Sequence, residues 1–110
     1  MNVILVEPCF PPNQREFARL EGGGNGDGST IDSEGRIYVT TNAGVQVISR
    51  EGKYLGIIPT PRGVISTAFG GTDKKTLYVL ARGATDASGA EVANAAQVHA
   101  IQLLAQGYKG

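Results

Sequence analysis

Residues 27–80 contain short runs in which apolar and polar side chains alternate, separated by turn-forming residues. The runs IYVTT (37–41) and VQVIS (45–49) show the alternation most clearly. A side-chain period of two is typical of strands with one buried face. Gly, Asp and Asn bound the runs, and these residues tolerate positive φ or hydrogen-bond their own backbone in tight turns. The pattern therefore predicts an all-β chain of antiparallel strands, with almost no helix.

The length and charge of the chain exclude several classes of protein. A chain of 110 residues is long enough for one small domain. The formal net charge is zero and there is no basic block, so we expect no nucleic-acid partner. No apolar run approaches the roughly 20 residues that span a bilayer, so we expect no membrane partner. The first twelve residues lack the basic region and cleavage site of a signal peptide, and we interpret them as mature chain.

Cys9 is the single cysteine, which excludes an internal disulfide. We therefore expect a cytoplasmic protein, although a periplasmic location stays open.

The chain divides into an N-terminal stretch, 1–14, and a sheet-forming unit, 15–110. The stretch 1–14 reads as an extension or an edge strand, because Pro8, Pro11 and Pro12 forbid a central strand. Residues 15–20 fit either a short helix or a strand with Phe17 on one face. The glycine-rich run 22–28 ends this element in either case.

The predicted strands form one complete unit and a second, shorter one. The segment TLYVLA (76–81) matches RIYVTT (36–41), since both carry a Tyr-Val pair after an apolar residue. Four strands repeating after roughly 35–45 residues are typical of β-propeller blades. We expect the second unit to lack its outer strand. The predicted strands are 29–32, 36–41, 45–50 and 53–59 in the first unit, and 64–69, 76–81 and 97–104 in the second.

An ordered set of short motifs resembles one known family. The set comprises Asp27-Gly28, the Ile31-Asp32 pair, the strand 37–39, GVQV (44–47), GKYLG (52–56), Pro59, FGG (69–71) and TLY (76–78). In this order they resemble the C-terminal third of the senescence marker protein / gluconolactonase / luciferin-regenerating enzyme family. The resemblance covers about residues 15–110, and the ending LLAQGYKG is similar to the tail of bacterial members.

The resemblance implies a six-bladed β-propeller with a divalent metal in its central channel, acting on lactones or related esters. About two blades are present here, and isolated blades would leave sheet faces and edges exposed. We therefore expect the chain to associate with itself, with a homotrimer favoured because three copies supply six blades, and a dimer possible. In this assembly, residues 15–20 would supply the missing outer strand to the next copy. The alternative is a non-catalytic, oligomerising propeller fragment with a vestigial site.

The resemblance assigns a role to Asp27, which lies where the family has an aspartate that binds the metal and acts as general base. The expected substrate is a small-molecule lactone, and the expected cofactor is Ca²⁺, Mg²⁺, Mn²⁺ or Zn²⁺, which the sequence does not distinguish. Considered by its spacing alone, Asp27 between two glycines is more often a turn residue, and only the resemblance favours a functional role. Neither the family's metal-binding Glu nor its Asn has a matching position in this chain.

Ser66 is a weaker candidate, for contact with substrate, because many relatives place Asn or Ser at this position facing the channel. Asp32 precedes a Ser-Glu-Gly turn, and we interpret it as a turn-capping residue. His99 lies in an apolar strand without a ligand partner nearby in sequence, which indicates a packed side chain.

Overall fold

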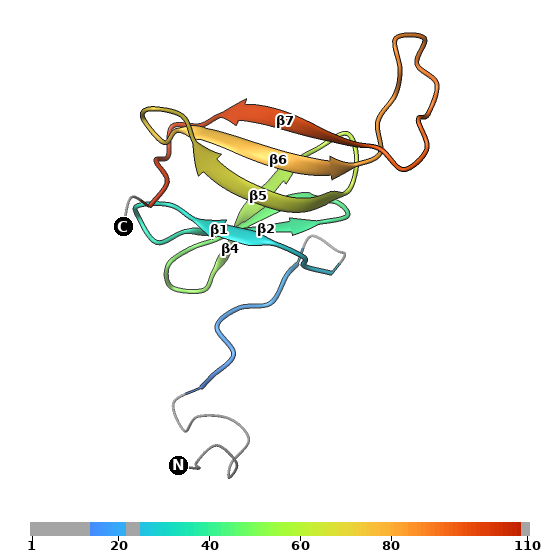
Figure 1. Ribbon diagram of the computed structural model, residues 1–110. Helices are drawn as coiled ribbons and strands as arrows, with labels where there is room; N and C mark the ends of the chain where they lie inside the picture. Colours follow the sequence, from blue (N-terminus) through green and yellow to red (C-terminus); the bar gives the residue numbers. More distant parts are fainter. Residues whose placement is uncertain (1–13, 22–24, 109–110) are drawn as a thin grey trace, which may run out of the picture.

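The computed structural model describes residues 14–21 and 25–108, which form seven strands in two antiparallel sheets. No helix capable of crossing a membrane occurs in this part of the chain. Figure 1 shows the two sheets stacked as layers, with the first sheet below the second. The all-β prediction and the division into a complete unit and a shorter one are therefore confirmed.

The first sheet has four strands in the order β1-β2-β3-β4. Each strand pairs with the one before it in sequence, as expected of a meander joined by tight turns. The pairing of β3 with β4 shifts register between Val47 and Ile48. The strands are β1 (Ser29–Ile31), β2 (Ile37–Thr41), β3 (Gly44–Ile48) and β4 (Tyr54–Pro59).

The second sheet has three strands in the order β5-β6-β7, so one long edge of β7 has no partner strand in the described part of the chain. The three strands are β5 (Val64–Gly70), β6 (Thr76–Arg82) and β7 (Ala96–Gln102). A loop of residues 83–95 joins β6 to β7 and projects beyond the sheet (Figure 1). The predicted absence of a fourth strand in this unit is confirmed for the described residues.

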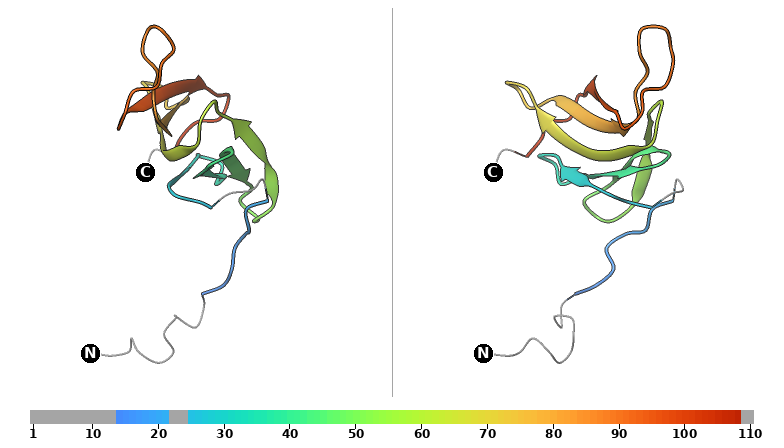
Figure 2. Two further views of the ribbon diagram at one scale, coloured as in Figure 1. Left: turned by 90° about the vertical axis from the view of Figure 1, so that its right-hand side faces the viewer. Right: turned by 45° about the vertical axis from the view of Figure 1, so that its right-hand side comes forward.

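Two predicted elements differ from the structure. Residues 15–20 form neither helix nor strand; they are part of a segment, 14–21, that leaves the first sheet on the side away from the second (Figure 2). The last strand ends at Gln102 rather than at 104, and the side chain of Leu104 is 98% exposed. Alternation does continue through 104, but Leu103 donates its N–H to Lys75 O (2.9 Å), and no strand pairing continues beyond it.

The core lies between the two sheets. Side chains on the inner face of the first sheet, Tyr38 and Val45, meet Val64, Leu77 and Val79 of the second. All five are at most 3% exposed. The Tyr38 ring packs edge-on against Phe69, with ring centroids 5.1 Å apart and planes at 87°, a preferred geometry for aromatic pairs. Each sheet therefore buries one face and leaves its other face outward.

The segment after β7 returns to the first sheet and joins the two layers. Gln106 O accepts the N–H of Ser33 (2.6 Å), and the N–H of Tyr108 reaches Ile31 O (3.2 Å). Between them, Gly107 packs so closely on Phe69 that an added Cβ would overlap the Phe69 side chain. Only glycine fits this approach, which places the C-terminal segment against the start of the first meander.

Candidate active site

Asp27 lies in the loop immediately before β1, and its side chain is 52% exposed. Its backbone is nevertheless fixed, because its N–H donates to Thr40 O on β2 (3.1 Å). The N–H of Thr40 in turn donates to Gly28 O (2.8 Å). These two hydrogen bonds extend the pairing of β1 with β2 back to Asp27. They fix the backbone that carries the carboxylate at the end of the sheet.

The hydroxyl of Thr40 fastens the same loop to the second sheet. Thr40 is fully buried, and its Oγ1 accepts the N–H of Gly28 (2.8 Å). Two carbonyl oxygens lie within reach of the hydroxyl hydrogen, Gly28 O at 3.0 Å and Ile65 O at 2.8 Å. Because Ile65 belongs to β5, one side chain of β2 connects the Asp27 loop with both sheets.

Gly28 brings this loop into direct contact with β5. A Cβ added at Gly28 would lie 2.9 Å from Ile65 O and 3.1 Å from Ser66 Cα. Any larger residue would push the loop away from the second sheet. Close packing therefore requires a glycine at position 28. This packing also places Ser66, the second candidate residue, beside the Asp27 loop.

Ser66 is exposed on the outer face of the second sheet. It lines a shallow hollow of about 170 Å³ together with Ala68, Tyr78, Leu80 and Val98. The structure therefore brings the Asp27 loop and Ser66 to neighbouring positions, although no hydrogen bond joins the two side chains among the described contacts. Their proposed roles in catalysis and substrate contact remain predictions.

Arg82 is the residue at this site that the sequence analysis missed. Its Nη2 lies 3.6 Å from Oδ2 of Asp27, and its side chain is 61% exposed. A pair this open to solvent contributes little to stability, so both groups stay available to a ligand. The internal repeat could have indicated Arg82. Arg82 follows TLYVLA in the second unit as Asn42 follows RIYVTT in the first. Because β1 and β2 are antiparallel, the end of β2 next to Asn42 lies beside Asp27, just before the start of β1.

The described residues alone do not make a closed metal site. No group of three or more His, Cys, Asp or Glu side chains comes together in 14–21 and 25–108. Asp27 offers one carboxylate, whereas Ca²⁺ takes six to eight oxygen ligands and Mg²⁺ six. The cation nearest to this carboxylate in the structure is the Arg82 guanidinium. A divalent cation at Asp27 would need further ligands from elsewhere.

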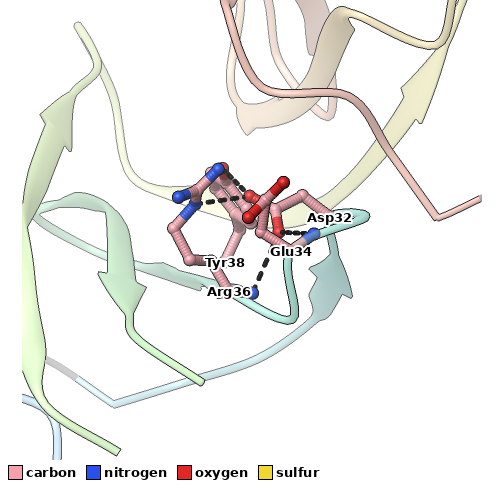
Figure 3. Close-up of polar contacts among 4 residues, drawn as sticks. All are labelled: Asp32, Glu34, Arg36 and Tyr38. Atoms are coloured by element: carbon pink, nitrogen blue, oxygen red, sulfur yellow. Dashed lines mark hydrogen bonds and ion pairs between the residues drawn. The ribbon is translucent and has the colours of Figure 1, made fainter. Parts of the chain in front are cut away.

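Asp32 lies at the opposite end of β1 and belongs to the scaffold. It is 1% exposed and its carboxylate accepts four hydrogen bonds (Figure 3). Oδ1 accepts the N–H groups of Glu34 and Arg36 (2.9 Å each), as predicted for a turn-capping residue. Oδ2 accepts Arg36 Nε at 2.6 Å and the Tyr38 hydroxyl at 2.7 Å, two contacts that the sequence analysis missed.

These bonds set the ionisation of the buried pair. Burial on its own would raise the pKa of Asp32, but the hydrogen bonds from Tyr38, Arg36 and Glu34 outweigh it and lower this pKa below its ordinary value. Burial, and then the bond to Asp32, raises the pKa of Tyr38 to about 12. Tyr38 thus stays protonated and donates to an ionised Asp32, which places this carboxylate outside the chemistry of the site.

His99 is partly buried on β7 and its Nε2 has no hydrogen-bond partner among the described residues. It pairs in register with Val79, a core residue, and lies on the same inward side of the second sheet. The prediction of a packed histidine agrees with this position. Cys9 lies outside the described residues.

Two solved structures are similar to this chain. One is a protein assigned as a gluconolactonase, with a TM-score of 0.68 and 26% identity over 88% of this chain and 29% of its own. The other is a luciferin-regenerating enzyme, with a TM-score of 0.61 and 29% identity over 80% of this chain and 31% of its own. The chain therefore spans less than a third of the length of either protein.

The family model described as the SMP-30/gluconolactonase/LRE-like region matches residues 10–83, which is more than half of the chain. No curated protein matched. The matched range includes Asp27, the whole first sheet and β5, as well as β6 with its terminal Arg82. With the two-sheet architecture, this match establishes that the chain belongs to the SMP-30/gluconolactonase/luciferin-regenerating enzyme-like family.

Proposed function

We propose that the chain acts as a metal-dependent hydrolase of a sugar lactone or a related ester, assembled from several copies. The observation that carries this proposal is the placement of Asp27. It is a half-exposed carboxylate on a backbone fixed by Thr40, at the position of the family's Asp-Gly motif. A rigidly held, accessible carboxylate suits a group that must meet a water molecule and a substrate in a defined geometry.

In this reaction Asp27 accepts a proton from a water molecule while the water oxygen attacks the carbonyl carbon of the lactone. The ester bond to the ring oxygen then breaks, and the proton held by Asp27 passes to that oxygen, giving a hydroxy acid. Arg82, 3.6 Å from Asp27, places a positive charge beside the carbonyl oxygen as negative charge develops on it. Ser66 contacts the substrate from the adjoining strand.

The metal dependence is part of the proposal. Asp27 would be one ligand of a Ca²⁺, Mg²⁺, Mn²⁺ or Zn²⁺ ion, and the other ligands would come from neighbouring blades. We expect EDTA to lower hydrolysis of gluconolactone and an added divalent cation to restore it.

Replacing the carboxylate tests the catalytic role. Asp27→Asn keeps the size of the side chain but removes the base, so we expect hydrolysis to fall by about 10²-fold or more. Asp73→Asn is the matched control, because Asp73 is an exposed carboxylate in the turn at the opposite end of β6. Equal activity of wild type and Asp27→Asn would contradict the catalytic assignment.

The assembly that we propose is a closed ring, with a trimer favoured and a dimer as the lesser possibility. Three copies with two sheets each supply six blades, and three masses of 11.5 kDa give about 34.5 kDa. Residues 15–20 of one copy would pair with the open edge of β7 in the next. Light scattering that returns the mass of one copy at all concentrations would contradict this assembly.

A second candidate function is a non-catalytic, oligomerising module. It is favoured by the absence of a three-ligand cluster among the described residues. Assembly without metal-dependent hydrolysis would identify this function, because assembly and catalysis are separable properties.

A further inference from the structure

The two tyrosines of the repeat occupy the same place in their sheets. Tyr38 on β2 pairs in register with Thr30 on β1, and Tyr78 on β6 pairs with Ala68 on β5. One residue further along the first strand of each sheet stand Ile31 and Phe69. Tyr38 therefore corresponds to Tyr78, and Ile31 corresponds to Phe69.

The environments of these equivalent residues differ in a consistent way. Tyr38 is 3% exposed because it packs on Phe69 of the next sheet. Tyr78 is 41% exposed, and Ile31 is 42% exposed. Each thus lacks, within one copy, the contact that its counterpart makes. A contact between Tyr78 of one copy and Ile31 of another copy would supply what both residues lack.

The faces around these residues are apolar and lie outward. On the outer face of the second sheet, Ala68, Tyr78, Leu80 and Val98 line the hollow of about 170 Å³, and Val98 is 65% exposed. Ser66 lines the same hollow where the sheet approaches Gly28 and the Asp27 loop. Apolar side chains that adjoin one another on an exposed face are typical of surfaces that another protein covers.

The outer face of the first sheet has a hollow of its own, of about 310 Å³. It is lined by Ile37, Val39 and Ile48 and is partly roofed by Phe17 and Leu20 of the segment 14–21. In the repeat, Ile37 and Val39 correspond to Leu77 and Val79, which are fully buried against the first sheet. The outer face of the first sheet therefore corresponds to the inner face of the second sheet, which is buried.

We propose that the outer face of the second sheet of one copy packs on the outer face of the first sheet of another copy, with Tyr78 against Ile31. This contact repeats, between copies, the packing of Tyr38 on Phe69 within one copy. It rests on the assembly described under the proposed function and specifies its surfaces. Because the two surfaces differ, the contact is head-to-tail and continues from copy to copy until the ring closes.

The position of segment 14–21 agrees with this arrangement. The segment leaves from the outer side of the first sheet (Figures 1 and 2). In the proposed contact that side meets the second sheet of the neighbouring copy, whose β7 has an open edge. The same two copies would therefore share both the face contact and the donated strand.

Cysteine cross-linking tests the contact directly. In a background in which Cys9 is replaced by Ser, chains carrying Ile31→Cys are mixed with chains carrying Tyr78→Cys under mild oxidation. We expect a disulfide-linked dimer in the mixture and none from either variant alone, since two unlike surfaces meet. Ser88→Cys, exposed in the 83–95 loop, replaces Tyr78→Cys in the control mixture, which we expect to stay unlinked.

A cross-link formed by Tyr78→Cys alone would instead indicate a symmetric dimer through the second sheet, and would overturn the proposal. Equal linking with Ser88→Cys would overturn it as well, because it would show random collision.

A charge on the outer face provides the second measurement. Tyr78→Glu is expected to reduce the mass seen by light scattering to that of one copy, with an unchanged far-ultraviolet dichroism spectrum. Leu104→Glu is the matched control, because Leu104 is 98% exposed and lies outside this face. An unchanged mass for Tyr78→Glu would overturn the proposal. The Asp27→Asn variant should cross-link as well as the wild type does, so loss of catalysis and loss of the contact are distinguishable.

Discussion

At the scale of single residues, Asp32 fixes the turn between β1 and β2. Its carboxylate is 1% exposed, faces the Arg36 guanidinium at 2.6 Å and accepts three further hydrogen bonds. A buried, ionised carboxylate destabilises the folded state unless its hydrogen-bond donors keep their positions around it. Substitutions here therefore act on the fold and leave the candidate active site, at the other end of β1, to be tested separately.

We expect Asp32→Asn to lower the free energy of unfolding by about 3 kcal/mol at neutral pH, because it removes the charge opposite Arg36 and turns one acceptor into a donor. Urea denaturation measures this loss. Glu34→Gln is the matched control: it removes a carboxylate that is exposed two residues away, and we expect a change within about 0.5 kcal/mol. Similar losses in the two variants would contradict the role given to Asp32.

The pH dependence of this stabilisation has a defined sign. The pKa of Asp32 is lower in the folded chain than its unfolded value of about 3.9. Its contribution is therefore complete above the unfolded pKa and is lost as the pH falls through the folded pKa. We expect the difference in unfolding free energy between wild type and Asp32→Asn to shrink as the pH is lowered from about 5 to about 2. A constant difference over this range would contradict the assignment.

At the scale of the elements, β7 has an open edge, and segment 14–21 belongs to no strand in the described part of the chain. In the proposed assembly this segment donates a strand to the open edge of β7 in the next copy. In a strand, the N–H groups of successive residues point to opposite sides, so only alternate ones reach the neighbouring strand. Proline has no N–H and is tolerated at an edge only where that group would face solvent. Proline substitutions at two neighbouring positions, made one at a time, should therefore differ: one would remove an N–H that bonds to β7, and the other would remove an N–H that faces solvent.

We expect one of the two variants Ala18→Pro and Arg19→Pro to reduce the assembled mass and the other to leave it close to wild type. Light scattering at matched concentrations is the measurement, and the wild-type segment is the reference. If both variants assemble like the wild type, the segment does not donate a strand.

The sequence predicted the strands of both sheets to within one or two residues, because alternation and turn residues are local signals. It failed for residues 15–20, which form neither helix nor strand and for which we propose a partner strand in another copy. It also failed at Leu104, which continues the alternation although no strand pairs there. Asp27 could be singled out from the Asp-Gly motif, whereas Arg82 required knowing that the ends of β2 and β6 lie at the same rim. The bond from Tyr38 to Asp32 joins adjacent strands and had no local signal.

At the scale of the whole molecule, the two stacked sheets present two outer apolar faces. If copies cover these faces, the folded state includes its neighbours, and its stability depends on concentration. We expect the thermal midpoint to rise as the protein concentration is raised, and to rise less for Tyr78→Glu than for Leu104→Glu. Differential scanning fluorimetry over a hundredfold concentration range provides the test, and a midpoint that does not move would indicate a self-sufficient unit.

The buried hydroxyl of Thr40 has a mechanical consequence for Asp27, the proposed catalytic residue. Since it joins the loop below Asp27 to a carbonyl of β5, any tilt between the two layers is transmitted to that carboxylate over a single side chain. Substitutions between the two sheets, remote from the substrate, should therefore change the position of the Asp27 carboxylate. The shape of the layer contact and the chemistry at the rim would have to evolve together.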